Sequence, residues 1–168
     1  MAWTPPKTDF APGNILTAAQ MNAIGNNLDA VGDAWTSYTP TWTNVTLGSA
    51  TQDCAYRLTG KTVDVRIRLV LNGSTITGDP EATLPNGDTM RTYGALRFPL
   101  GLAGMLDTSV NFTYMGWVTP SNATYARVRF GVLSASAAWG STYTLSSSIP
   151  FTWANGDELL ANFTYEIA

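Results

Sequence analysis

The stretch TVDVRIRLVL, residues 62–71, decides the fold class of this chain. Apolar residues occupy every second position, and Asp64, Arg66 and Arg68 lie between them. Because successive side chains of a strand point to opposite faces, this pattern predicts a strand with one face in a core and the other in water. Half-buried strands of this kind are typical of antiparallel sheets.

Similar alternation follows on the C-terminal side of this stretch. Residues 109–118 and 122–133 both alternate, and Pro120 with its polar neighbours supplies a turn, so the two are expected to form a hairpin. Further strands are expected at residues 38–45, 55–59, 95–99, 142–146 and 159–167. About eight strands separated by turn signals are typical of a sandwich or barrel. We therefore predict a mostly β chain, with an antiparallel β-sandwich of the jelly-roll type at residues 37–168.

One short α-helix is expected before the β region. Thr17 and Gln20 have the spacing of a capping box. Apolar residues then recur at alternating intervals of three and four, which is one stripe of a heptad pattern. A helix of about four turns is marginal alone in water, so this stripe must be buried on the chain's own β body or on copies of itself around a symmetry axis. The stripe consists of Met21, Ile24, Leu28, Val31 and Trp35.

The first 13 residues are expected to form an extended arm. Pro5 and Pro6 are incompatible with a helix interior, and proline also favours extended geometry in the residue before it. Trp3 and Phe10 are large apolar groups on a segment that cannot bury them by itself. The arm is either a frayed terminus or a segment that docks these aromatic residues on a neighbouring protein.

Charge and hydropathy exclude two classes of partner. Charged residues make up 12% of the 168 residues, against the ~25% of an ordinary domain, and the net charge is −3. No basic patch is visible, so we expect no nucleic-acid binding. No run of 18 apolar residues occurs, so we expect no membrane span, and the opening residues lack the apolar core of a secretion signal.

The sequence offers few groups for catalysis or metal binding. It contains no histidine, which removes the commonest general base and the commonest metal ligand. A nucleophilic serine needs a base beside it, and the two lysines are Lys7 in the arm and Lys61 in a turn. The single Cys54 excludes an internal disulfide and is expected to be a small buried side chain. We predict no catalytic residue, no cofactor and no metal site.

Carboxylates and tryptophans leave two alternatives open. Glycan hydrolysis needs only two carboxylates, but Asp79 with Glu81, and Asp157 with Glu158, are read as turn residues and solvated loops. Several tryptophans could form a platform on which sugars stack, although core and interface packing is the ordinary role of tryptophan. These are Trp42, Trp117, Trp139 and Trp153.

The N-terminal segment resembles a known group of proteins. Trp3-Thr4-Pro5-Pro6, the stretch GNILTAAQMN at residues 13–22 and Asn26-Asn27-Leu28 are similar to the opening of small virion proteins of tailed bacteriophages, especially those of actinobacteria. The body is also similar, in YTPTW at residues 38–42, AYRLTGKTV at residues 55–63 and PFTWANGD at residues 150–157. Cys54 replaces an expected glycine, and residues 79–106 have no counterpart.

The resemblance implies a function that needs no chemistry. Members of this group are described as tail fibres, minor tail proteins, head fibres or capsid decoration proteins, and they are usually trimers. We therefore expect a non-enzymatic virion protein, assembled in the host cytoplasm, with residues 1–36 as attachment arm and trimerising helix. Its expected partners are two further copies and a major capsid or tail protein. A receptor-binding tail module for host cell-wall glycan is the alternative. The expected anchoring residues are Trp3, Pro5, Pro6 and Phe10, and the expected oligomer interface is the stripe that includes Met21 and Leu28.

Overall fold

The alternating stretch forms the strand that the sequence predicted. The computed structural model describes residues 15, 17–32, 35–91, 99–121, 127–133, 142–143 and 145–168. In it, β4 (Thr62–Val70) buries Val63, Val65 and Leu69 and leaves Arg68 exposed. The apolar face of this strand therefore provides the centre of the core.

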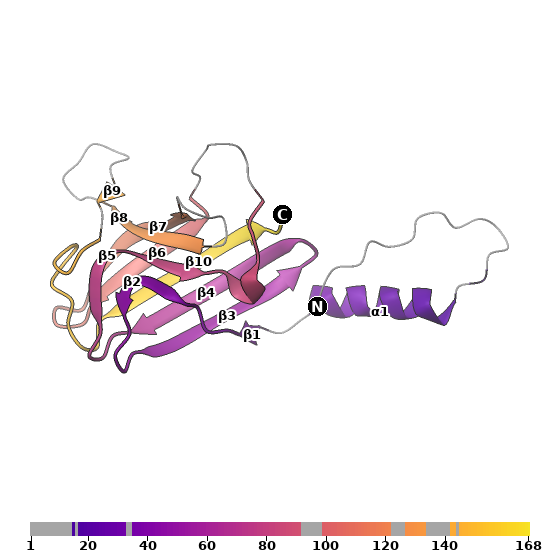
Figure 1. Cartoon of the computed structure of the whole chain (residues 1–168), viewed down its shortest axis with the longest axis horizontal. Helices are drawn as coiled ribbons and strands as arrows, with labels where there is room; N and C mark the ends of the chain where they lie inside the picture. Colours follow the sequence, from indigo (N-terminus) through magenta and orange to yellow (C-terminus); the bar gives the residue numbers. More distant parts are fainter. Residues whose placement is uncertain are drawn as a thin grey trace.

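All strands belong to one antiparallel sheet. Nine of them follow the order β1-β3-β4-β10-β6-β7-β8-β5-β2, and β9 pairs with β8. Figure 1 shows this sheet curling over itself. The bounds are β1 (Thr36–Ser37), β2 (Trp42–Thr46), β3 (Thr51–Thr59), β5 (Thr75–Thr83), β6 (Gly101–Asp107), β7 (Phe112–Pro120), β8 (Arg127–Leu133), β9 (Thr142–Tyr143) and β10 (Glu158–Glu166), with a 3₁₀ turn at Pro85–Gly87.

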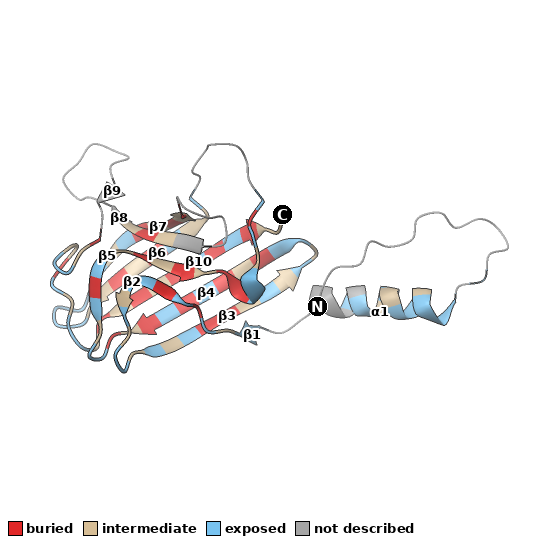
Figure 2. Cartoon of the chain, viewed as in Figure 1, coloured by how far each residue is buried: buried red, intermediate tan, exposed pale blue. Residues whose placement is uncertain are grey.

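The curl brings the two ends of the sheet together around the core. Trp42 of β2 stacks on Phe130 of β8, two strands away in the same half of the sheet, with 5.7 Å between ring centroids. The indole N–H of Trp42 also donates to Oε1 of Gln52 on β3, at 2.7 Å. Buried positions alternate with exposed ones along the strands in Figure 2. The mostly β, antiparallel prediction is confirmed, whereas the jelly-roll sandwich is not, because the strands form a single curled and open sheet.

The helix α1 (Ala18–Gly32) begins with the predicted capping box. The backbone N–H of Thr17 donates to Oε1 of Gln20 at 2.9 Å, and the N–H of Gln20 donates to Oγ1 of Thr17 at 3.3 Å. The helix ends before Trp35, so that residue does not continue the helical stripe. In Figure 1 the helix extends beyond the end of the sheet and covers neither of its faces. It is too short and too polar to cross a bilayer, and the described residues contain no other candidate span.

Removing the cap is expected to weaken the helix. A Thr17→Ala variant should lose about 1 kcal/mol of helix stability, because the backbone N–H of Gln20 loses its acceptor, Oγ1 of Thr17. The measurement is the helical signal in far-ultraviolet circular dichroism during heating. Thr152→Ala, at an exposed loop threonine, is the matched control. Equal signals from both variants would contradict the role of the cap.

Two strands lie where the sequence predicted no strand pattern, and some predicted segments lie outside the described residues. β5 and β6 both overlap residues 79–106. The described pairings of β5 with β2 and β8 skip residues 77–80, where Gly78, Asp79 and Pro80 would weaken a ladder. The predicted arm, and residues 95–98 of a predicted strand, lie outside the described residues.

Candidate functional site

The apolar ridge of α1 is exposed to solvent in the single chain. The ridge consists of Met21, Ile24 and Leu28, whose exposed fractions are 52%, 38% and 66%. Their spacing places them on one face of the helix. The side chain of Val31 lies outside the described residues. The structure thus brings three of the predicted interface residues together and leaves them uncovered.

Trp35 packs on the outer face of the β body. Its ring lies between two guanidinium groups, 5.3 Å from that of Arg57 on β3 and 5.0 Å from that of Arg66 on β4. Nε of Arg57 is 2.9 Å from Oδ2 of Asp64, and Oγ1 of Thr164 donates to Oδ1 of the same carboxylate at 2.7 Å. The hydrogen bond from Thr164 and the charge of Arg57 lower the pKa of Asp64. Trp35 therefore ties the segment after the helix to the sheet.

Loss of this indole is expected to loosen the attachment. A Trp35→Ala variant should unfold with about 1 to 2 kcal/mol less free energy, because two cation–π contacts and their packing disappear. Trp35→Phe, which keeps a ring between the arginines, should recover part of the loss. Urea denaturation of the three proteins gives the comparison. A Trp35→Ala protein as stable as the unchanged chain would show that the contacts contribute nothing.

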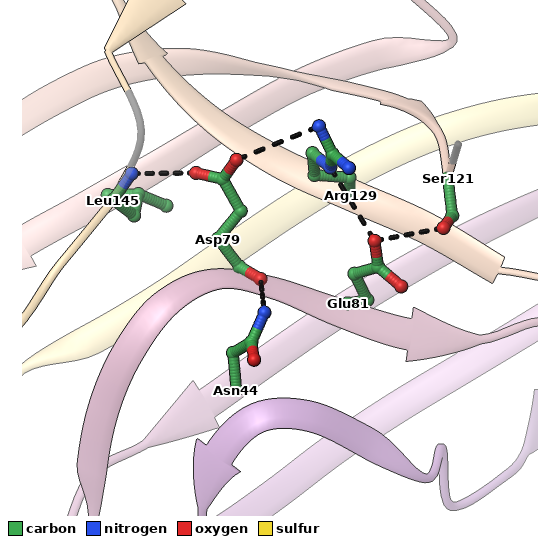
Figure 3. Close-up of polar contacts among 6 residues, drawn as sticks. All are labelled: Asn44, Asp79, Glu81, Ser121, Arg129 and Leu145. Atoms are coloured by element: carbon green, nitrogen blue, oxygen red, sulfur yellow. Dashed lines mark hydrogen bonds and ion pairs between the residues drawn. The ribbon is translucent and has the colours of Figure 1, made fainter. Parts of the chain in front are cut away.

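A cluster of charged side chains joins β5 to β8 in the described part of the chain (Figure 3). Oδ1 of Asp79 accepts the backbone N–H of Leu145 at 2.7 Å, and its Oδ2 is 3.8 Å from Nη1 of Arg129. Oε1 of Glu81 accepts the hydroxyl of Ser121 at 2.9 Å and lies 3.5 Å from Nε of Arg129. Burial raises the pKa of Asp79, against the opposing effects of the Leu145 N–H and the Arg129 charge.

The cluster connects three strands, β2, β5 and β8. Nδ2 of Asn44 on β2 donates to the main-chain oxygen of Asp79 at 2.8 Å, so polar groups from four segments meet on β5. Both carboxylates face the same guanidinium, which holds them as a charge-paired group. The arrangement supports a cross-link between β2, β5 and β8 more directly than a pair of catalytic carboxylates.

Asp157 is a structural residue that sequence reasoning misread. It was expected to be a solvated turn residue, but it is 1% exposed. Its Oδ1 accepts both the backbone N–H and the hydroxyl of Thr108 at 2.9 Å, and its Oδ2 accepts the N–H of Ala154 at 2.7 Å. The carboxylate therefore joins the turn after β6 to the segment that leads into β10.

Metal-binding chemistry finds no support in the described part of the chain, where no three side chains of the ligand types His, Cys, Asp and Glu gather. Cys54 is buried, as expected, and burial raises its pKa to about 11. Its thiol is therefore neutral at physiological pH, which is unsuitable for a nucleophile.

The three described tryptophans of the predicted sugar platform do not gather on one exposed surface. Trp42 is in the core, Trp117 is half-buried on β7, Trp153 is half-buried in the segment before β10, and Trp139 lies outside the described residues. Instead, four aromatic rings follow one another with centroid separations of 4.9, 5.3 and 4.5 Å. This aromatic row consists of Phe112, Tyr114, Phe151 and Trp153.

The aromatic row lies at the end of the body opposite to the helix. β1, which follows the helix, pairs with the C-terminal half of β3, whereas Phe112 begins β7 at the other end of the ladder. Figure 1 shows the helix at one end and the turn between β6 and β7 at the other. The pattern of alternation predicted Phe112 and Tyr114 on one face, but their meeting with Phe151 joins residues that are far apart in the chain, which no local pattern indicates.

The expected anchoring residues, Trp3, Pro5, Pro6 and Phe10, lie outside the described residues. The described candidate surfaces are the ridge of α1 and the aromatic row of the β body. No family model, no curated protein and no solved structure matches this chain.

Proposed function

We propose that this chain is a non-enzymatic structural protein of a tailed bacteriophage particle, a homotrimer that projects from the particle surface. The observation that carries the proposal is the uncovered ridge of α1, formed by Met21, Ile24 and Leu28. A 15-residue helix is marginal in water unless an apolar face is buried. Full burial of each such side chain contributes about 1.5 to 3 kcal/mol, which is enough to stabilise the helix in an assembly.

Copies of the same helix are the partner that the geometry favours. The ridge follows the three-four spacing of a coiled-coil seam, and such a seam is complementary to itself around a symmetry axis. The helix extends beyond the sheet, so its ridge is available to other chains (Figure 1). The exposure of Met21, Ile24 and Leu28 favours this partner over the alternative, packing of the ridge on the chain's own body.

The polarity of the molecule supports attachment at one end and display at the other. The helix, which follows the proposed arm, lies at one end of the body, and the turn between β6 and β7 lies at the opposite end. The arm, with Trp3 and Phe10, would dock on a major capsid or tail protein. Three arms presented together would raise the avidity through effective concentration. The curled antiparallel body is compatible with a relationship to jelly-roll domains.

The solution mass tests the proposal directly. Sedimentation equilibrium at micromolar concentration is expected to give three times the 18.0 kDa of one chain. A single 18.0 kDa species over the whole concentration range would refute self-assembly. Mass spectrometry of purified particles then tests the location, because hundreds of copies per particle indicate the capsid lattice and a handful indicates the tail.

A receptor-binding module for host cell-wall glycan is the second candidate, and the aromatic row favours it. The exposed ring of Phe112 contacts Tyr114, and Tyr114 contacts the buried Phe151. These rings lie at the end of the body opposite to the helix. Rings of this kind can stack on the apolar faces of sugars. Binding to purified host cell walls should decrease in Phe112→Ala and remain in Leu102→Ala, which removes an exposed apolar side chain from another surface. Equal binding by both variants would exclude the aromatic row as the site.

A further inference from the structure

The described β body concentrates its exposed apolar side chains on one hairpin. The large apolar residues of the sheet that are exposed are Leu102, Val110, Phe112 and Met115, and all four belong to β6, β7 or the turn between them. Leu102 is 60% exposed and Met115 is 48% exposed. Exposed apolar groups that gather in this way mark an interaction surface more often than scattered ones do.

Strand register places several of these residues on the outer face of the sheet. Leu102 is opposite Trp117 on β7 and opposite Asn162 on β10. One step along, Gly104 is opposite Met115 and Leu160. We define the hairpin face as Leu102, Met115, Trp117 and Leu160. Its four side chains carry no charge and lie on the opposite side of the sheet from the core.

Two glycines, Gly104 and Gly131, lie in the sheet next to the large side chains of the hairpin face. A Cβ at Gly104 would lie 3.8 Å from Cβ of Leu160, and a Cβ at Gly131 would lie 3.9 Å from Cδ1 of Trp117. The larger side chains can therefore lie along the sheet over the glycine positions. A broad apolar surface results, with the polar atoms of the strands already paired in the ladders.

Charged residues border the hairpin face on both sides. On β4, Arg66 and Arg68 are exposed in the same rows of the sheet, and Arg68 is paired with Glu158. On the other side, Arg129 is opposite Thr119 of β7 and pairs with Glu81. An uncharged centre with a charged rim is the usual anatomy of a protein–protein interface.

The position of Trp35 identifies the occupant. Trp35 packs on Arg66, and Arg66 lies in the same row as Asn162, Leu102 and Trp117. The segment that follows the helix therefore joins the body on the same face that carries the apolar patch. If the helices gather around a threefold axis, the bodies attached through Trp35 are held close together, and this face is the apolar surface that lies next to the attachment.

We propose that the hairpin face packs against a second copy of this chain, so that the bodies as well as the helices are in contact. This inference rests on the proposed self-assembly. It adds that the subunits meet through β6, β7 and β10, next to the attachment of Trp35. The outer surface of β5 and β8, with its Asp79–Arg129–Glu81 cluster, stays outside the contact.

Thiol labelling of the full chain tests the contact. The variants are Met115→Cys, in the hairpin face, and Thr75→Cys, at an exposed position of β5 outside it. The native Cys54 is buried and serves as an unreactive internal reference. In the assembled protein, the thiol at position 115 should react with a maleimide at least about tenfold more slowly than the thiol at position 75. In a Leu28→Asp background, which separates the chains, this protection should disappear.

The outcomes separate the inference from the function on which it rests. A trimer in which both thiols react equally fast would overturn the body contact and leave the helix-mediated assembly standing. Protection of position 115 that persists in a single-chain species would overturn it as well, because the chain itself would then cover the face. A protein that sediments only as one chain would refute both the assembly and the contact.

Discussion

A Leu28→Asp variant is expected to sediment as a single chain, whereas the unchanged protein sediments as a trimer. Leu28 is the most exposed residue of the ridge, at 66%. In the proposed assembly its side chain faces the axis, where three carboxylates would be brought together and removed from water. Each uncompensated buried charge costs several kcal/mol, which exceeds the contribution of one leucine to the assembly. Sedimentation velocity at micromolar concentration measures the effect.

Asn26→Asp is the matched control for that variant. It introduces the same charge into the same helix, but Asn26 is exposed on the face opposite to the ridge. The control should remain trimeric and should keep the helical signal. If both variants or neither of them dissociate, the ridge is not the assembly surface. The comparison therefore tests the position of the charge and not its presence.

The sequence predicted the strands whose environment repeats every two residues. β4 and β10 bury apolar side chains on one face and carry polar side chains on the other. Val65 and Phe163 could therefore be assigned to the interior from their alternating positions alone. The capping box of Thr17 and Gln20 is equally local and is confirmed. Such features depend on residues within one or two turns of each other, which a single sequence contains in full.

Other parts of the fold depend on contacts that are distant in the chain. β6 contains Gly101 because a Cβ there would lie only 2.1 Å from the main-chain oxygen of Asn162, and this close approach to β10 has no local signature. Pro80 lies in β5 where the described ladders are interrupted. The hydrogen bond between Trp42 and Gln52 likewise depends on the curl of the whole sheet, because β2 and β3 lie near opposite ends of the strand order.

Of the two candidate interaction surfaces, the sequence predicted the ridge of α1 and did not predict the hairpin face. The ridge was predicted from its periodicity, but the sequence placed Trp35 on it, and only the structure shows that residue between two arginines of the sheet. The hairpin face was not predicted. β7 carries apolar residues at both parities, for example Met115 and Val118, so alternation alone could not separate the core face from an exposed one.

An Asp157→Ala variant is expected to lose about 3 to 5 kcal/mol of unfolding free energy, because three hydrogen bonds to one buried charged group are lost. The carboxylate is buried and accepts hydrogen bonds from two groups of Thr108 and from the N–H of Ala154. Alanine would remove the shared acceptor of all three donors and leave a gap at a buried position. It would also release the turn after β6 from the segment that enters β10, and β10 pairs with both β4 and β6.

Urea denaturation, followed by tryptophan fluorescence, measures this loss. Asp107→Ala is the control, because Asp107 accepts two hydrogen bonds from Ser109 within its own turn and lies nearer to solvent. That variant should lose about 1 kcal/mol, since water can replace the missing acceptor. Asp157→Asn should fall between the two, because the amide keeps one acceptor oxygen and replaces the other with a donor. If Asp157→Ala were no less stable than Asp107→Ala, the buried carboxylate would not be what fixes the start of β10, and the entry of this strand would depend on its apolar residues, such as Leu159, alone.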